Sequence, residues 1–213
     1  MLLANASLPV VAGILVALVV GITFHEFSHA ALADALGDHR PRALGRVSLN
    51  PLRHLEPVGA LFFLIAGFGW GKPVPVNGYA LRPGPIGMSI VAGAGPIANF
   101  AVAAVFAVVF RGFDAAGLLE QEFVRLVLAS IVYFNVLLGF FNLLPIPPLD
   151  GYNVMLPFLP PRQQFMVQRY AQFGYLALLA LVVFSSGPGG GPLQWLFGAA
   201  SAIAGAMIGA GVA

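Results

Sequence analysis

The amino-acid sequence predicts an all-α protein that crosses a membrane several times, and its composition is the first reason. Of its 213 residues, 59% are hydrophobic and only 8% are charged, whereas a typical soluble domain carries about 25% charged residues. The mean hydropathy is +0.91. The chain has more apolar side chains than one soluble core could bury, so lipid must serve as part of its solvent.

Long apolar segments are the second reason. A helix that spans the hydrocarbon core of a bilayer needs about 20 predominantly apolar residues. Five segments meet or approach this length, at about 8–34, 85–110, 122–144, 168–185 and 192–212. A sixth apolar run, at 57–69, is shorter and is typical of a re-entrant or interfacial segment.

The distribution of basic residues decides how the short run is interpreted, because Lys and Arg mark cytoplasmic loops. If 57–69 does not cross and the first helix begins outside, most basic residues fall on the inner side; if it crosses, this asymmetry nearly disappears. We therefore predict about five transmembrane helices plus a re-entrant, β-hairpin-like element at about 56–83, where prolines exclude a regular helix. The inner basic residues would be Arg40, Arg42, Arg46, Arg53, Lys72, Arg82, Arg162 and Arg169.

The rest of the composition limits the class of protein. The chain has no cysteine, which excludes disulfides and thiolate metal sites, and a net charge of +2 without a basic run argues against nucleic-acid binding. The first apolar run has no basic stretch before it, so we read a retained helix and not a signal peptide. We predict one membrane-embedded domain over 1–213, with a core at about 8–160 and accessory helices at about 166–212.

The strongest chemical signal is the H-E-x-x-H sequence at 25–29. Residues four apart in a helix lie on one face, so the imidazoles of His25 and His29 can reach one zinc ion. Glu26 is one residue further round, where it can act on water and not as a ligand. A chance pair of buried histidines is the alternative. Ionisable residues inside an apolar stretch are costly unless paired or metallated, which favours the metal site.

A catalytic zinc needs a third protein ligand, and Asp150 is the best candidate. It follows the stretch 142–149, in which three prolines must break the preceding apolar helix. Broken helices survive at membrane depth where they line a cavity. An N-cap for the next helix is the other role for Asp150, but a cap alone would not explain the prolines beside it.

With these motifs the chain resembles the site-2 protease family of intramembrane metalloproteases. The H-E-x-x-H at 25–29 and the N-x-x-P-x-x-x-x-D-G at 142–151 are similar to the paired signatures of that family, in the expected order. The segment 94–99 looks like its G-P-x-x-N helix, and 50–59 looks like the compact bacterial and archaeal subgroup. The resemblance covers roughly residues 10–160, and three motifs in register make it specific.

The resemblance implies roles for individual residues. His25, His29 and Asp150 would bind one Zn²⁺ per chain, and Glu26 would be the general base and proton shuttle. Asn142 would hold substrate or support the oxyanion, and Asn99 would shape the site. An interhelical hydrogen bond without a catalytic role is the alternative for both asparagines, and for Asn99 it is an equal one. Gly93 and Gly95 would allow close helix contact.

Three further residues are weaker candidates. His54, which stands near Glu56, could cap the re-entrant element, contact substrate or compete for the metal, but a purely structural histidine is the favoured interpretation. Val74 and Val76 lie in a strand-like edge at about 70–80. Such an edge could pair with an extended substrate and keep it unwound.

The function that follows is zinc-dependent hydrolysis of a peptide bond in or near a transmembrane segment of a membrane-protein substrate. The expected partners are this substrate, the lipid bilayer and a regulatory membrane protein. A membrane zinc transporter would need further ligands along a path, and an inactive adaptor would not need an intact Glu26. We expect a multi-pass protein of a prokaryotic inner membrane, with its active site shallow and towards the cytoplasm.

Overall fold

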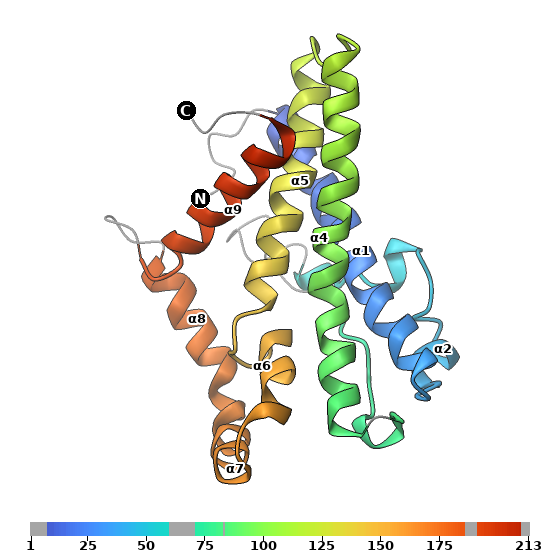
Figure 1. The fold of residues 1–213 in the computed structure, drawn as a ribbon, viewed down its shortest axis with the longest axis vertical. Coiled ribbons are helices and arrows are strands. Elements are labelled where there is room, and N and C mark those ends of the chain that lie inside the picture. Colours follow the sequence, from blue (N-terminus) through green and yellow to red (C-terminus); the bar gives the residue numbers. More distant parts are fainter. Residues whose placement is uncertain (1–7, 60–70, 83, 186–190, 210–213) are drawn as a thin grey trace.

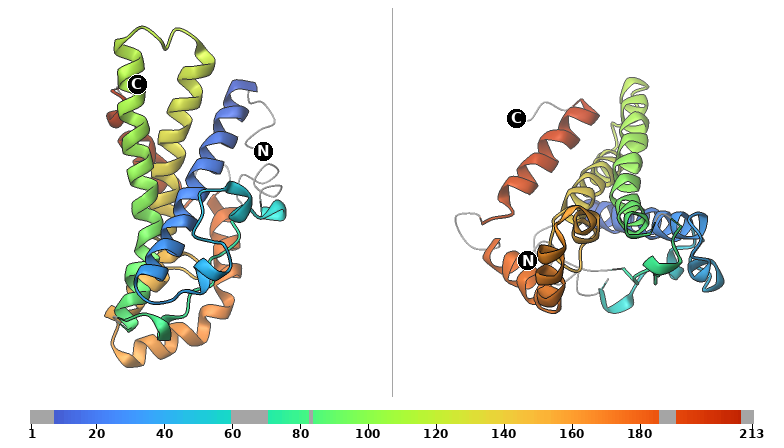
Figure 2. Two further views of the ribbon diagram at one scale, coloured as in Figure 1. Left: turned by 90° about the vertical axis from the view of Figure 1, so that its right-hand side faces the viewer. Right: turned by 60° about the horizontal axis from the view of Figure 1, so that its bottom comes forward.

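Three long helices form the centre of the molecule. The computed structural model describes residues 8–59, 71–82, 84–185 and 191–209. Helices α1 (Leu8–Ala35), α4 (Pro85–Ala115) and α5 (Glu122–Asn142) run side by side (Figures 1 and 2). A helix pairs the backbone groups of its interior with one another, which is what lipid requires of a spanning segment. Helix α4 begins with a proline at its first position, where a missing N–H costs no hydrogen bond.

Within the described residues, four helices are long and apolar enough to cross a membrane: Leu8–Ala35, Pro85–Ala115, Glu122–Asn142 and Pro161–Ser185. The last of these combines α7 (Pro161–Tyr170) and α8 (Gly174–Ser185), joined by a short 3₁₀ turn. The fifth expected span, at 192–212, is described only as α9 (Gln194–Ile208). Its 15 residues extend about 22 Å, less than the roughly 30 Å hydrocarbon core. The prediction of five spans was therefore one too many for the described residues.

Small residues let the helices pack closely. Helix α9 lies obliquely against α5 and α4 (Figure 1), and the contact buries alanines of α4 and α9 against valines of α5. Close backbone approach through small side chains is how helices associate in lipid, where apolar burial alone gives no preference for helix contact. This core is made by Ala103, Ala107, Val132, Val136, Ala200 and Ala204.

The break after α5 determines where the next element lies. Helix α5 ends at Asn142, and α6 (Asp150–Met155) begins after a loop that contains three prolines, with a cis bond between Pro147 and Pro148. Gly151 packs against the Leu143 carbonyl so closely that a Cβ there would collide with it. The loop therefore folds back tightly, and α6 packs against α4 and not in line with α5.

Short elements cover the other side of α1. They are α2 (Arg40–Ala43) and two 3₁₀ turns, Pro51–Arg53 and Gly78–Ala80. The hairpin-like element expected at 56–83 falls partly on 60–70 and 83, outside the described residues. In the parts of it that are described, β pairing is limited to an isolated bridge between Leu55 and Gly71, so 71–80 is not a strand there.

Buried charges hold this loop region together. Asp38 is 1% exposed and accepts hydrogen bonds from the Arg40 guanidinium at 2.9 and 3.0 Å and from the Asn77 backbone N–H at 2.6 Å. The Arg40 guanidinium holds the pKa of the Asp38 carboxyl at about 2, below its usual value. Arg46, which is also buried, donates to the Lys72 carbonyl. The segment 72–77 is thereby tied to the end of α1.

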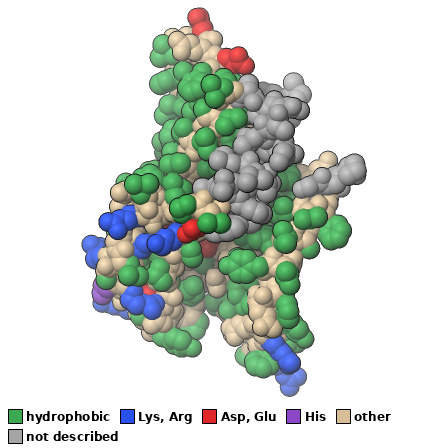
Figure 3. Space-filling view, turned by 180° about the vertical axis from the view of Figure 1, so that it is seen from behind, with side chains coloured by type: hydrophobic (Ala, Val, Ile, Leu, Met, Phe, Trp, Pro, Cys, Tyr) green, Lys and Arg blue, Asp and Glu red, His purple; other side chains and the backbone are tan. Residues whose placement is uncertain are grey.

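Charged side chains are unevenly distributed along the molecule. Lys and Arg gather on the half that carries the short elements and α7, whereas acidic side chains stand out at the opposite end (Figure 3). That opposite end holds the turn between α4 and α5, with Asp114, Glu120 and Glu122 exposed there. The two ends of the helices thus differ in charge, as membrane proteins with a defined orientation do.

Candidate metal centre

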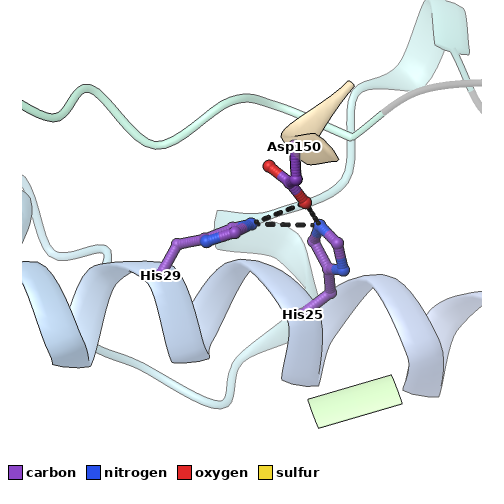
Figure 4. A group of neighbouring side chains, drawn as sticks. All are labelled: His25, His29 and Asp150. Carbon is purple, nitrogen blue, oxygen red and sulfur yellow. Dashed lines mark hydrogen bonds and ion pairs between the residues drawn. The ribbon is translucent and has the colours of Figure 1, made fainter. Parts of the chain in front are cut away.

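Two histidines of α1 point to one place. His25 and His29 are four residues apart, so they share a helix face. Their Nε2 atoms are 3.1 Å apart, and the two rings meet edge to face with centroids at 4.6 Å (Figure 4). Both residues are only 8% exposed, although they lie in an apolar helix.

Asp150, which is far from both histidines in the sequence, completes the group. As the first residue of α6, it brings its Oδ2 atom to 3.0 Å from His25 Nε2 and 3.3 Å from His29 Nε2 (Figure 4). The proline break delivers it there, because a continuous α5 would have carried residue 150 past the site. Asp150 begins its helix without a side-chain cap hydrogen bond, so the N-cap alternative does not describe its contacts.

The ring protons of both histidines are directed away from this group. His25 Nδ1 lies 2.7 Å from the side-chain oxygen of Asn99, and His29 Nδ1 lies 2.7 Å from the carbonyl of Val91. Both oxygens accept, so each neutral imidazole carries its proton on Nδ1 and presents a lone pair on Nε2. Asp150 Oδ2 is buried and accepts no hydrogen bond within the described residues. Three lone-pair donors thus face one another.

This donor set fits zinc. Ligand atoms bound to a tetrahedral zinc at about 2.0–2.1 Å lie roughly 3.3 Å from one another. The three donor atoms here are separated by 3.0, 3.1 and 3.3 Å, and without a cation their lone pairs would repel. Nitrogen and carboxylate oxygen in a set of three, with one position left open, are typical of catalytic zinc sites. Among the described residues this is the one such group of three, so a transport path with further ligands has no support there.

A glycine of α4 makes room for the two imidazoles. A Cβ on Gly95 would lie 2.7 Å from His25 Nε2 and closer still to His29 Nε2. Gly93, which the sequence also indicated, is less confined, since its Cβ would be 4.0 Å from the nearest atom, on Val154. Close contact between α1 and α4 at the metal-binding atoms therefore depends on Gly95.

Glu26 lies beside the donor group and not in it. Its side chain is half-buried, on the side of α1 that faces the loop region. A Cβ on Gly71 would be 3.3 Å from Glu26 Oε1, so the backbone at residue 71 runs directly past this carboxylate. The structure thus separates the face of α1 that carries His25 and His29 from a neighbouring carboxylate, as the order His-Glu-x-x-His predicts.

The weaker sequence candidates lie apart from the donor group. Asn142 donates from Nδ2 to the Leu138 carbonyl of its own helix, at 3.0 Å. His54 is fully buried and places Nε2 at 2.6 Å from the Ser48 carbonyl, which agrees with a structural role. Val76 packs into a core cluster of buried residues of α1 and α4, and no described contact relates Val74 to the donor group.

Two partners of the site were missed in the sequence. The Val91 carbonyl is a backbone group, which leaves no trace in residue type. Asn135 hydrogen bonds to Asn99 and is fully buried in α5. As a polar residue in the middle of an apolar helix, Asn135 could have been found by the same reasoning that selected His25.

A helical membrane protein with a buried His–His–carboxylate centre is the class that this structure defines, and comparison with known proteins agrees. The model of peptidase family M50 matches residues 114–185. The candidate zinc metalloprotease YwhC of Bacillus subtilis is 34% identical over 180 residues, covering 80% of each chain. The candidate zinc metalloprotease Rip2 of Mycolicibacterium smegmatis is 32% identical over 169 residues, which cover 76% of this chain and 63% of that protein. Rip2 of Mycobacterium tuberculosis is also 32% identical, over 206 residues that cover 91% of this chain and 74% of that protein. No solved structure gives a significant match.

The chain therefore belongs to peptidase family M50, the site-2 protease family, which confirms the resemblance seen in the sequence. It is an integral, multi-pass membrane protein and an intramembrane zinc protease. The family match itself covers the segment that contains Asp150 but not the helix that contains His25 and His29. The relatives extend the similarity over most of the chain.

Proposed function

We propose that His25, His29 and Asp150 hold the catalytic zinc and that Glu26 is the general base of an intramembrane endopeptidase. The observation that carries this proposal is the convergence of two imidazole Nε2 atoms and one carboxylate oxygen within 3.3 Å of one another at a buried position. Such a group is favourable only when a proton or a metal ion is shared among the three atoms, and a metal ion can bind all three at once. The proposed domain is the whole chain, with the C-terminal helices as accessory elements.

Zinc bound there would polarise the scissile carbonyl and lower the pKa of the attacking water. Glu26 takes a proton from that water as its oxygen attacks the carbonyl carbon, and gives the proton to the amide nitrogen as the C–N bond breaks. The products are one carboxylic acid and one amine. Glu26 can serve both steps because it lies next to the donor group without taking part in it.

Two asparagines support the chemistry in this proposal. Asn99 orients His25 through its side-chain oxygen, 2.7 Å from Nδ1. Asn142 ends α5 just before the proline loop, is half-buried and comes eight residues before Asp150. We assign Asn142 to substrate or oxyanion binding, since one amide hydrogen remains for this role when the other bonds to Leu138.

The substrate is a transmembrane segment of another protein, cleaved in an extended form. An α-helix shields each amide with its own turn, so the segment must unwind before water can attack. Residues 72–77 form no helix or turn and end at an extended Asn77, and the backbone just before them, at Gly71, passes close to Glu26. We infer that the backbone around Val74 and Val76 pairs with the unwound substrate.

The active site faces the cytoplasm in this proposal. His29 is one to two helical turns from the end of α1, after which the basic loop region begins. Basic residues favour the cytoplasmic side, and water would reach the metal from there. We also propose that the protein resides in a prokaryotic inner membrane and is regulated by a membrane partner.

Co-expression with a single-span membrane substrate tests the proposal. Glu26→Gln removes the base but no ligand, so cleavage should disappear while the purified protein retains zinc. His29→Ala should lose both. Glu122→Gln, at the exposed start of α5, is the matched control and should cleave normally. Cleavage by Glu26→Gln at the wild-type rate would remove Glu26 as the base, and full zinc content in His29→Ala would remove the metal site.

A further inference from the structure

A buried hydrogen-bond relay connects α5 to the donor group. Asn135 and Asn99 are both 0% exposed, in the middle of apolar helices. Asn99 Nδ2 donates to Asn135 Oδ1 at 3.0 Å and to the Gly21 carbonyl at 3.1 Å. Asn135 Nδ2 in turn donates to the Ile131 carbonyl at 2.9 Å. The relay thus begins on α5, passes through α4 and ends at His25 on α1.

The direction of every hydrogen bond in the relay is fixed from its far end. The Ile131 carbonyl can only accept, so Asn135 must direct its NH₂ group there and its oxygen towards Asn99. Asn99 then meets two acceptors, the Asn135 oxygen and the Gly21 carbonyl, with its NH₂ group. Its own oxygen is left for His25 Nδ1. Turning either amide round would set oxygen against oxygen in a buried place, which is strongly unfavourable.

We propose that Asn135 is a positioning residue for the metal centre. By holding Asn99 in one orientation, it keeps the proton of His25 on Nδ1 and the Nε2 lone pair directed at the metal position beside Asp150. This inference rests on the proposed role of His25 as a ligand. Partners of this kind behind a ligand typically change metal affinity about 10- to 100-fold when removed.

The two histidines differ in a way that makes this role testable. His29 is oriented by the Val91 backbone carbonyl, which side-chain substitution leaves in place. His25 is oriented by a side chain that needs a second side chain behind it. The absence of a side chain at Gly21 lets Asn135 lie close to the α1 backbone, because a Cβ there would be 3.0 Å from Asn135 Oδ1. Substitution of Asn135 therefore weakens one ligand and spares the other.

The experiment measures zinc affinity of the purified, detergent-solubilised chain by competition with a chelator. Asn135→Leu removes the acceptor with little change of volume, and we expect about tenfold weaker binding, at the lower end of the range because Asn135 acts through Asn99. Asn135→Asp, whose carboxyl is protonated when buried, keeps an acceptor for Asn99 and a donor for the Ile131 carbonyl, and should lie closer to wild type. Thr23→Val is the control: Thr23 is buried two residues from His25, but in the described part of the chain its hydroxyl bonds to Val19 of its own helix alone.

A double-mutant comparison separates positioning from simple helix packing. Asn99→Ala cuts the relay, so adding Asn135→Leu to it should cause no further loss of zinc affinity. Independent losses from the two substitutions would instead show that Asn135 only joins helices. Wild-type affinity in a folded Asn135→Leu, or in Asn135→Ala should the leucine variant not fold, overturns the inference. Zinc retention by His25→Ala would instead overturn the proposed metal site, so the two failures are distinguishable.

Discussion

The two sides of α1 are built in different ways. On one side the Nε2 and Nδ1 atoms of His25 and His29 are held by partners on α4 and α6, and the two orienting residues, Asn99 and Val91, are buried. On the other side, Glu26 faces short elements whose positions depend on ion pairs, such as Asp38 with a half-exposed Arg40. The metal-binding side is thus set by helix packing, and the carboxylate side by electrostatics. Changes on the two sides should therefore affect different measurements.

The largest effect is expected from Gly95→Ala. The added methyl group would lie 2.7 Å from His25 Nε2 and nearer to His29 Nε2, so both ligands must move. We expect zinc affinity and cleavage to fall by at least about 100-fold, the upper end of what loss of a partner behind a ligand costs, because here the ligands themselves are displaced. Gly93→Ala is the matched control, since its methyl group meets only Val154 at 4.0 Å. Equal zinc content in the two variants would contradict the packing argument.

A substitution on the carboxylate side should spare the metal. Arg46→Met removes the buried guanidinium that donates to the Lys72 carbonyl. A hydrogen bond from a charged donor contributes about 1.5–3 kcal/mol, so the segment that begins at Gly71 should be released from Glu26. Cleavage should fall about 10-fold or more with normal zinc content, measured on the same sample. Arg53→Met, at an exposed position, is the control; zinc loss in Arg46→Met would mean that the two sides are not separate.

Acid should loosen the loop region through Asp38. Its pKa of about 2 in the folded chain is below the usual value of about 3.9. The carboxylate's contribution to stability is therefore complete above about pH 4 and is lost as the pH falls towards 2. The protection of the Asn77 amide, which bonds to Asp38, should decrease over this range when its hydrogen exchange is compared with the intrinsic exchange rate at each pH. In Asp38→Asn the protection should be lower already at pH 6 and should not fall further between pH 4 and 2; unchanged protection in the variant would exclude Asp38 as the anchor.

The smallest effect is expected far from both sides. Arg125 and Asp114 form an ion pair at 3.4 Å in which both side chains are more than half exposed. Such pairs contribute about 0–1 kcal/mol. Arg125→Ala should leave thermal stability, zinc content and cleavage within experimental error of wild type. A clear change in any of the three would show that the end of the molecule opposite the basic half also supports the centre.

The sequence predicted what depends on local pattern. Helical spacing placed His25 and His29 on one face, and the prolines before Asp150 correctly indicated a break in the helix. It did not predict how far α9 extends or that Val76 packs into a core cluster. Those outcomes depend on which surfaces meet in three dimensions. The Val91 carbonyl could not have been predicted at all, because every residue type has a carbonyl.

The long separation of Asp150 from α1 has a consequence for biosynthesis. Asp150 comes 125 residues after His25, and at roughly 5–20 residues per second the ribosome needs about 6–25 s to add them. During this interval α1 is already synthesised, but the Asp150 carboxylate that lies beside its two histidines is not. The residues that contact or orient the two histidines are synthesised before Asp150. They are Val91, Gly95, Asn99 and Asn135. We expect both imidazoles to be already oriented when the carboxylate arrives.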